Sequence, residues 1–117
     1  MLTRIYDTLK GARINVYFAG QKKGNCTEKY AVVYEGVRSQ FQSYTTDVCY
    51  YTVAVVVPEN MYSKATAYLD EVVKALNVLY PSVKRTHSRT NVLWDDMANG
   101  WTASEDFTTY KKWERRI

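Results

Sequence analysis

The residues best suited to acid–base or nucleophilic chemistry are His87, the one histidine of the chain, and its neighbour Ser88. A catalytic histidine must be oriented by a partner and must lie within reach of a nucleophile. Adjacent residues of a β-strand point to opposite faces of the sheet, so His87 and Ser88 do not form a catalytic pair. We therefore interpret His87 as a surface residue of a strand, and rank a hydrolase or nuclease using His87 with Asp95 or Asp96 last among the functions considered.

Acidic residues gather around a predicted hairpin bend: Asp95 and Asp96 before it, Glu105 and Asp106 after it. Their oxygen atoms are ligands that a divalent cation prefers. The spaced Asp/Asn ladder of a calcium loop is missing from the sequence, however, and adjacent carboxylates at a bend are usually turn formers. We expect a turn here rather than a metal site.

Glycine and cysteine add no cofactor motif. Gly20 and Gly24 flank a basic loop, but the Gly-Lys-Ser/Thr sequence of a phosphate-binding loop does not follow them. Cys26 and Cys49 match neither a metal motif nor a dense disulfide framework. We expect reduced thiols, with Cys49 as a small buried hydrophobe, although a bridge between the two stays open. The sequence predicts no cofactor and no catalytic residue.

Composition is that of a folded domain with an interaction surface. The chain has 117 residues, of which 46% are hydrophobic and 24% charged, a balance that excludes a disordered chain. Aromatic residues reach 15%, including eleven tyrosines, which are enriched in sheets and at interfaces. The net charge of +4 is dispersed, so it favours solubility over a nucleic-acid tail. The start of the chain does not resemble a signal peptide, and the longest apolar run, 53–57, is too short to span a bilayer, so we expect no membrane contact.

Hydrophobic spacing predicts the elements that position these residues. Residues 2–10 have helical spacing, with Gly11 as the C-cap. Strands are predicted at 14–18 and at 30–35, the latter ended by Gly36.

A weaker strand is predicted at 41–46, with Asp47 as a turn residue after it. Residues 48–57 are β-branched or aromatic almost throughout, which predicts a central strand ending at Pro58. A long helix capped by Asn60 or Ser63 should follow and end at Pro81. Its apolar face comprises Met61, Ala65, Tyr68, Leu69, Val72, Val73, Leu76 and Leu79.

The C-terminal part reads as a long hairpin, with strands at 83–94 and from 100 to about 113 and an Asn99–Gly100 bend. The fold class is therefore α+β: one mixed, mainly antiparallel sheet of five or six strands, with the short and the long helix packed on it. Consecutive strands should pair antiparallel, and only the connection through the long helix could be parallel. Residues 1–117 form a single domain.

The last predicted strand allows two interpretations. One of its faces combines aromatic and basic residues, as in proteins that bind single-stranded nucleic acid: Phe107, Thr109, Lys111, Trp113 and Arg115. An edge or interface strand that meets a neighbouring subunit explains the same residues. We favour the interface and keep a small nucleic-acid-binding module as the alternative.

The order of elements resembles the small tail terminator proteins, also called tail completion or neck proteins, of long-tailed bacteriophages and phage-tail-like bacteriocins. The resemblance rests on the helix at 2–10, the strand at 14–18, the Tyr-Ala-Val-Val-Tyr strand with its Gly36 break, the strand at 51–57 that runs into Pro58 and the long helix, and the hairpin with Asp95 and Asp96 near its bend. It spans nearly the whole chain and carries over no functional residue.

The resemblance implies a non-enzymatic virion component, assembled in the bacterial cytoplasm, that forms a homo-oligomeric ring, typically of six subunits, on the head-proximal end of the tail tube. Its partners would be its own copies, the tube protein, the sheath and the head-completion or neck proteins. Nucleic acid would meet it only as DNA passing through the ring lumen. Ring interfaces use strand edges and aromatic or arginine anchors. The residues that we predict at subunit or tube interfaces are Lys22, Lys23, Phe41, Tyr44, Arg85, Arg89, Trp101, Phe107, Tyr110, Lys111 and Trp113.

Overall fold

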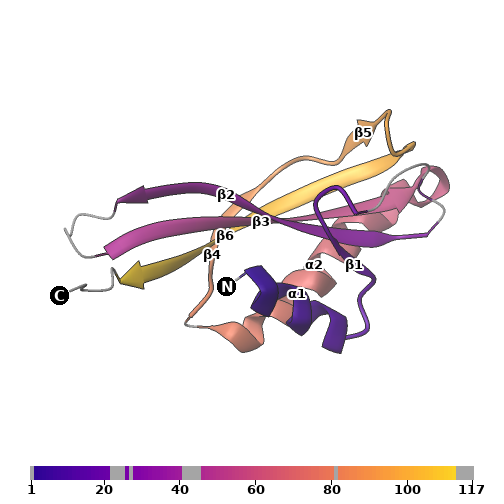
Figure 1. Ribbon diagram of the computed structural model, residues 1–117. Helices are drawn as coiled ribbons and strands as arrows, with labels where there is room; N and C mark the ends of the chain where they lie inside the picture. The colour runs from indigo at the N-terminus through magenta and orange to yellow at the C-terminus, as the bar shows by residue number, and fades with distance from the viewer. Residues whose placement is uncertain (1, 22–25, 27, 41–45, 81, 113–117) are drawn as a thin grey trace.

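The computed structural model describes residues 2–21, 26, 28–40, 46–80 and 82–112, with only the backbone described at 36–40, 46–48 and 110–112. The described residues form a six-stranded sheet with two α-helices, α1 (Leu2–Gly11) and α2 (Ala65–Leu76), packed on one face (Figure 1). The predicted α+β class, with a short N-terminal helix and one long helix, is confirmed.

The sheet has the strand order β1-β2-β3-β6-β4, and β5 follows β4 along the same edge of β6. The strands are β1 (Val16–Phe18), β2 (Tyr30–Gln40), β3 (Thr46–Pro58), β4 (Lys84–Arg89), β5 (Leu93–Asp95) and β6 (Gly100–Lys112). The Val-rich strand β3 pairs with β2 and β6, so its predicted central position is confirmed. The predicted C-terminal hairpin also forms, although its first half is divided into β4 and β5.

One strand pair contradicts the sequence-based prediction. β1 runs parallel to β2, with Val16 beside Ala31, whereas we expected consecutive strands to pair antiparallel. The two strands therefore run in one direction, although they are consecutive along the chain. β3 and β4, joined through α2, are both antiparallel to β6 and are separated by it.

Two predicted strand ends are also wrong. β2 continues through Gly36, and its register with β3 shifts between Glu35 and Arg38, so the glycine lies in a bulge. Asp47, predicted as a turn residue, lies in β3 opposite Gln40 and Lys111. Pairing on both sides of β3 outweighs the local preference of an aspartate for turns.

Helix α1 ends in a Schellman motif centred two residues beyond Gly11. The amide of Ile14 donates to the carbonyl oxygen of Leu9 at 3.1 Å, and the amide of Arg13 donates to that of Lys10 at 3.1 Å. Arg13 takes the left-handed conformation, with φ of 63°, so the predicted glycine cap is wrong. Leu9 and Ile14 are both buried, which supplies the hydrophobic contact of this motif.

Helix α2 follows a 3-10 helix, η1 (Glu59–Lys64), and continues into a second one, η2 (Asn77–Leu79). The N-cap positions of η1 and α2 are Pro58 and Lys64, so the prediction of Asn60 or Ser63 as the cap is wrong. The predicted apolar face is confirmed: Met61 is partly buried against the core, and the buried residues are Ala65, Tyr68, Leu69, Val72, Val73, Leu76 and Leu79.

The main hydrophobic core lies between the sheet and the helices, where Val53, Val55 and Leu69 are fully buried. Each such side chain contributes about 1.5–3 kcal/mol by leaving water. A second cluster, containing Cys26, Tyr30, Val56 and Ala98, covers part of the opposite face near one end of the sheet. At the other end, β2, β3 and β6 continue beyond the helices (Figure 1).

Candidate interaction surfaces

A buried ion cluster connects α2, β4 and β6. The carboxylate of Glu105, only 1% exposed, accepts hydrogen bonds from Arg85 Nε at 2.8 Å and Nη2 at 2.9 Å, and from Arg89 Nε at 3.0 Å. Arg89 Nη1 also donates to Asp70 Oδ1 on α2 at 2.6 Å. The predicted interface residues Arg85 and Arg89 therefore direct their charge into the protein's own structure.

The protonation state of Glu105 follows from these contacts. Burial raises the pKa of its carboxyl, but the hydrogen bonds from Arg85 and Arg89 outweigh burial and hold the pKa below its ordinary value. The carboxylate is therefore ionised at neutral pH, with both oxygen atoms engaged by guanidinium groups.

A bulge in β4 makes this arrangement possible. Arg85 lies opposite Phe107 and Arg89 opposite Glu105, so β4 advances four residues where β6 advances two. His87, at the centre of the bulge, takes a φ of 60° and is exposed. The irregularity turns both arginines toward the helix side of the sheet and places the histidine at the surface.

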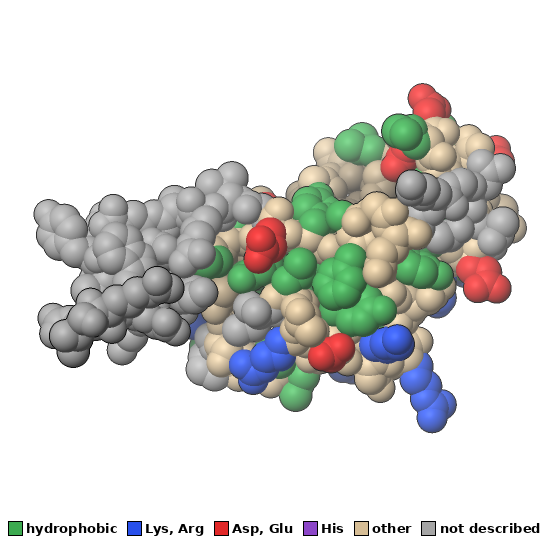
Figure 2. Space-filling model, in the orientation of Figure 1, with side chains coloured by type: hydrophobic (Ala, Val, Ile, Leu, Met, Phe, Trp, Pro, Cys, Tyr) green, Lys and Arg blue, Asp and Glu red, His purple; other side chains and the backbone are tan. Residues whose placement is uncertain are grey.

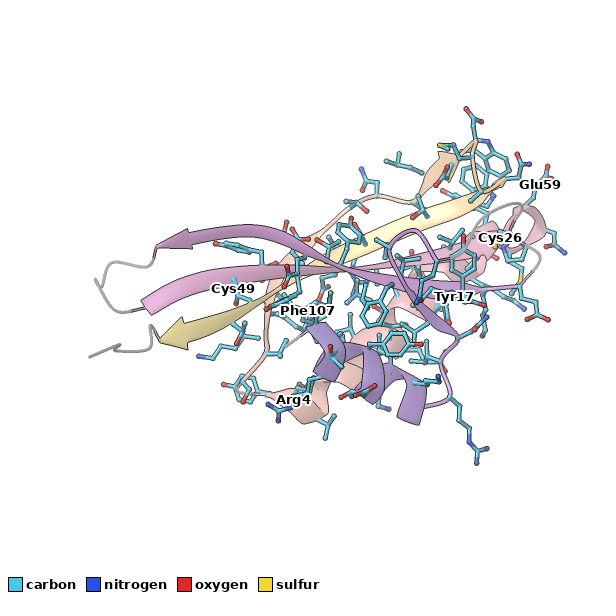
Figure 3. All side chains as sticks on the ribbon, in the orientation of Figure 1. Arg4, Tyr17, Cys26, Cys49, Glu59 and Phe107 are labelled. Carbon is cyan, nitrogen blue, oxygen red and sulfur yellow. The ribbon has the colours of Figure 1, made fainter. Side chains whose placement is uncertain are left out.

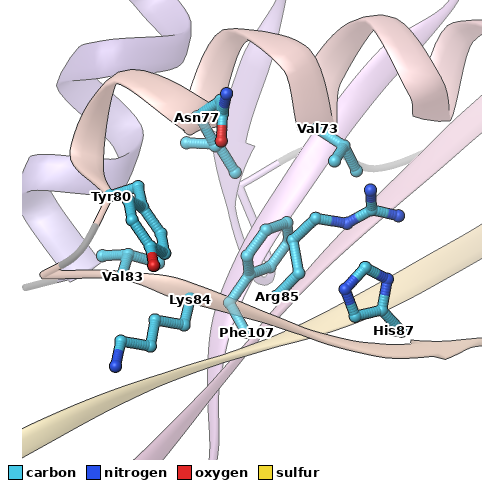
Figure 4. A pocket seen from close by; sticks show the side chains of 9 residues that line it. Val73, Asn77, Tyr80, Val83, Lys84, Arg85, His87 and Phe107 are labelled. Atoms are coloured by element: carbon cyan, nitrogen blue, oxygen red, sulfur yellow. The ribbon is translucent and has the colours of Figure 1, made fainter.

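Beside this cluster lies a hollow that we call the basic pocket, lined by Val73, Leu76, Asn77, Tyr80, Val83, Lys84, Arg85, His87 and Phe107. Its volume is about 290 Å³. Figure 4 shows the Phe107 ring between Tyr80 and His87, with Arg85 beside the ring and the Lys84 side chain extending away from it. A smaller hollow of about 260 Å³, which includes Asp70 and Lys74, shares Val73, Asn77 and Arg85 with it. The two form one groove between α2 and β4, with an apolar floor and several cationic side chains.

At the other end of α2, the exposed side chains of Tyr62, Leu93, Trp94 and Met97, together with the partly buried Trp101, form the turn patch. The Trp94 and Trp101 rings meet edge to face at 5.1 Å, and Tyr62 meets Trp101 in the same manner at 4.6 Å. Met97 is 90% exposed and Leu93 58%. Exposed apolar side chains gathered in one place are a feature of surfaces that bind a partner, so we treat the turn patch as a candidate interaction surface.

The loop that carries Met97, between β5 and β6, is held by its own hydrogen bonds. Asp95 Oδ1 accepts from the amides of Met97 at 2.9 Å and Ala98 at 3.3 Å, which confirms its predicted role as a turn former. Asn99 has a φ of 49°, as expected at the bend. Figure 2 shows acidic and hydrophobic side chains next to each other at the tip of this loop, at the upper right.

The predicted interface residues are not all at the surface. Phe107 is 2% exposed and packs in the core, because the alternation of β6 places it on the helix-covered face with Glu105 and Thr109. It also lines the basic pocket, so its place at an interface between copies stays a prediction. Trp101 is partly buried and belongs to the turn patch.

The remaining predicted residues are less fully described. Tyr110 and Lys111 lie on β6 opposite Val48 and Asp47. The other predicted contacts lie outside the described residues: Lys22, Lys23, Phe41, Tyr44 and Trp113.

The exposed apolar residues that lie near the two ends of α2 were not predicted from the sequence. Tyr80 and Val78 are exposed beyond its C-terminus, whereas Leu93 is exposed on β5 and Met97 in the β5–β6 loop. These residues could have been found from the sequence, because apolar side chains at predicted turns are expected to be exposed to solvent. The Glu105 cluster was detectable only through the pairing of β4 with β6.

The two cysteines, both within the described part of the chain, are not joined by a disulfide. Both are buried, Cys26 in the second cluster and Cys49 in the main core, toward opposite ends of the sheet (Figure 3). Across the described ranges, no three His, Cys, Asp or Glu side chains form a group that could hold a metal ion. None of the helices described has both the length and the apolar character needed to cross a membrane.

Comparison of the sequence with protein-family models yields no matching family, and comparison with curated proteins likewise yields no match.

Proposed function

We propose that this chain is a non-enzymatic structural subunit of a bacteriophage tail or tail-like particle. In this proposal, copies of the chain close into a ring, of six subunits by the family resemblance, on the head-proximal end of the tail tube. The ring ends polymerisation of the tube and forms the joining surface for the head or neck. The observation that carries the proposal is the presence of two unlike exposed surfaces, the turn patch and the basic pocket, at opposite ends of α2.

Two different surfaces on one protomer are what a ring interface requires. In a symmetric dimer the same patch meets itself, whereas in a head-to-tail assembly one patch meets a second, complementary patch of the next copy. Such contacts close into a ring when the rotation between copies divides a full turn. The turn patch supplies aromatic anchors, and the basic pocket supplies a hollow beside cationic side chains.

The extended end of the sheet supports contact with a further partner. β2, β3 and β6 run past the helices, so this stretch of strand pairing lies away from the main core (Figure 1). Sheet that projects beyond its own helical layer gains stability when another protein covers it. We assign this extension to the tail tube, with sheath and neck proteins as neighbours of the assembled ring.

The nucleic-acid alternative receives less support. It requires aromatic and basic side chains together on an open face of β6, but Phe107 and Thr109 are buried on the helix-covered face. The described residues of the open face are mainly hydroxyl-bearing, such as Thr102 and Thr108, together with the carboxylate of Asp106. An open face of this kind offers phosphates little attraction.

The test is to incubate the purified chain with isolated tail tubes of the same particle and image them by electron microscopy. We expect a collar at one end of each tube and tubes of defined length when the chain is added during polymerisation. The absence of a collar, or random decoration along the tube, would contradict the proposal. A salt-dependent shift of labelled single-stranded DNA by the isolated chain would favour the alternative instead.

A further inference from the structure

We propose that the open edge of β2 in one copy pairs with the open edge of β6 in the next copy, so that the three-stranded extension of the sheet continues from subunit to subunit. The inference rests on the proposed ring, to which it adds a contact made by backbone groups. The partner at each edge is a second copy of this chain. The tip and the faces of the extension are left for the tail tube.

The extension has a strand edge on either side, because neither outer strand reaches it. β1 pairs with β2 only at 31–33, and the pairing of β4 with β6 extends no further than Thr108. Beyond these points the described part of the sheet consists of β2, β3 and β6, with Arg38 opposite Cys49 and Cys49 opposite Thr109 (Figure 1). The backbone groups along such an edge are a template for a further strand.

The groups that β2 presents at its edge follow from its pairing with β1. Ala31 donates its amide, at 2.8 Å, to the residue before β1, and the carbonyl of Val33 accepts from the residue after β1 at 3.3 Å. The partners of Ala31, Val33, Arg38 and Gln40 are all odd-numbered residues of β3, so the bulge keeps these four residues in phase. The amides and carbonyls of Arg38 and Gln40 therefore point to the open edge.

The groups that β6 presents follow from its other neighbours in the same way. The carbonyl oxygens of Ser104 and Asp106 accept hydrogen bonds at 2.9 Å from residues on the β4 side. The register of β6 with β3 is unbroken along the whole strand, so this alternation continues to its end. The amides and carbonyls of Tyr110 and Lys112 therefore point to the open edge.

The two edges match in direction and in the residues that they bring together. β2 and β6 run in the same direction because each is antiparallel to β3, so copies related by rotation about an axis along the strands place them side by side as a parallel pair. At equal height along the extension, Arg38 of one copy meets Thr109 of the next, and Gln40 meets Lys111. Like charges, which destabilise a strand pair when directly opposite, do not face each other in this arrangement.

Pairing between unlike edges identifies a second copy as the partner. The edges of β2 and β6 lie on opposite sides of β3, so they cannot pair with each other within one chain. A twofold contact of β2 with β2 would leave every β6 edge open, whereas the β2–β6 contact uses both edges of every copy. Closure of the series into a ring removes the open edges altogether, as in a β-barrel.

Proline substitution at an outward amide tests the pairing, because proline has no N–H and is tolerated on an edge strand whose amide faces solvent. Arg38→Pro blocks the β2 edge, and Tyr110→Pro blocks the β6 edge. Each should weaken self-association by about tenfold or more, measured by sedimentation at several concentrations. The matched controls Arg38→Ala and Tyr110→Ala lose the same side chains but keep the amide, so they should associate like the wild type.

Far-ultraviolet circular dichroism shows whether each proline variant keeps its sheet. If either variant loses it, Gln40→Pro on β2 and Lys112→Pro on β6 block the same edges closer to the tip, where fewer ladder contacts follow.

Mixing the two proline variants gives the sharpest readout. Each variant retains the edge that the other has lost, so the pair can make one β2–β6 contact and no more. An equimolar mixture should therefore form a dimer with one copy of each variant, although neither variant associates alone.

The outcomes separate the inference from the proposed function. Loss of association in both proline variants but not in the alanine controls, with a dimer in the mixture, supports the inference. A wild-type ring that persists in the proline variants, or that is lost equally in the alanine controls, overturns the inference and leaves the ring standing. A proline variant that still forms a dimer with itself shows pairing of like edges and overturns the inference.

Two further results assign the edges elsewhere. A wild-type chain that stays monomeric at every concentration overturns both the inference and the ring. Proline variants that associate like the wild type but no longer form a collar on tail tubes assign the edges to the tube protein, which also overturns the inference.

Discussion

The middle and the beginning of strand β6 hold polar and aromatic side chains in opposite states. In its middle, Glu105 is enclosed between Arg85 and Arg89, and its carboxylate is satisfied within the chain. At its beginning, Trp101 joins Trp94 and Tyr62 in a patch that remains open to solvent. The closed cluster stabilises the fold, whereas the open patch is one of the surfaces at which we propose that copies meet. Variants at the first site should therefore change stability, and variants at the second should change assembly.

The largest effect should come from the core beside the closed cluster. Phe107→Ala should lower the free energy of unfolding by about 4 kcal/mol, because the ring is fully buried under α2 and leaves a cavity. Chemical denaturation followed by circular dichroism measures the loss. A destabilisation below about 1 kcal/mol would place Phe107 outside the core and would favour its sequence-predicted role as a surface contact.

Breaking the ion cluster around Glu105 should lower the free energy of unfolding by less than the loss of the Phe107 ring does. Glu105→Gln should lower the free energy of unfolding by about 2 kcal/mol at pH 7, because two guanidinium groups lose their charged partner while keeping part of their contact with water. Equal stability of the variant and the wild type at pH 7 would show that the cluster contributes nothing.

The pH dependence of that difference has a defined sign. The folded-state pKa of Glu105 is lowered, so the cluster stabilises the protein above the unfolded-state pKa near about 4.3 and loses this contribution as the pH falls through the folded value. The gap in unfolding free energy between wild type and Glu105→Gln should therefore close in acid. A gap that stays constant from pH 7 to pH 3 would exclude this origin.

An intermediate effect is expected where the hairpin returns to the sheet. At Gly100, an added Cβ would lie 2.6 Å from the carbonyl oxygen of Val57, which belongs to the central strand and cannot easily move. Gly100→Ala should therefore lower the unfolding free energy by about 2 kcal/mol and displace the Trp101 ring, which near-ultraviolet circular dichroism detects. An unchanged aromatic spectrum would contradict the close approach.

The smallest effect on stability is expected at the open patch. Trp94→Ala should change the unfolding free energy by about 1 kcal/mol or less, because the ring is partly exposed, yet it should weaken self-association by about tenfold or more. Sedimentation at several concentrations measures the association. Full association in this variant, with a large loss of stability, would reverse the comparison between the middle and the beginning of β6.

The sequence predicted those parts of the fold that depend on local pattern. The apolar face of α2, the central position of the Val-rich strand and the bend at Asn99 and Gly100 follow from periodicity and turn chemistry. The parallel pairing of β1 with β2 did not, because the residue pattern within each strand does not set the direction in which the two strands pair. The C-cap of α1 was also predicted at the wrong residue. The left-handed residue that terminates α1 is Arg13 rather than Gly11, because the packing of Leu9 against Ile14 fixes where the helix ends.

The candidate surfaces were predicted only in part, for the same reason. Trp101 was expected at an interface and lies in the turn patch, but Tyr80 and the pocket arise from the meeting of α2 with β4, residues distant in sequence. Arg85 and Arg89 looked like free cations until the bulge at His87 turned both toward Glu105. The sequence identifies charged and aromatic side chains that could bind a partner. The tertiary structure decides which of them already bind another residue of the same chain.

The central claim is that copies of this chain assemble head to tail into a closed ring. Size-exclusion chromatography with light scattering on the wild-type chain, repeated over a range of concentrations, tests it most directly. The account predicts a discrete species of more than two subunits, six by the family resemblance, each of 13.6 kDa. A monomer at every concentration, or a dimer that never grows, would contradict it.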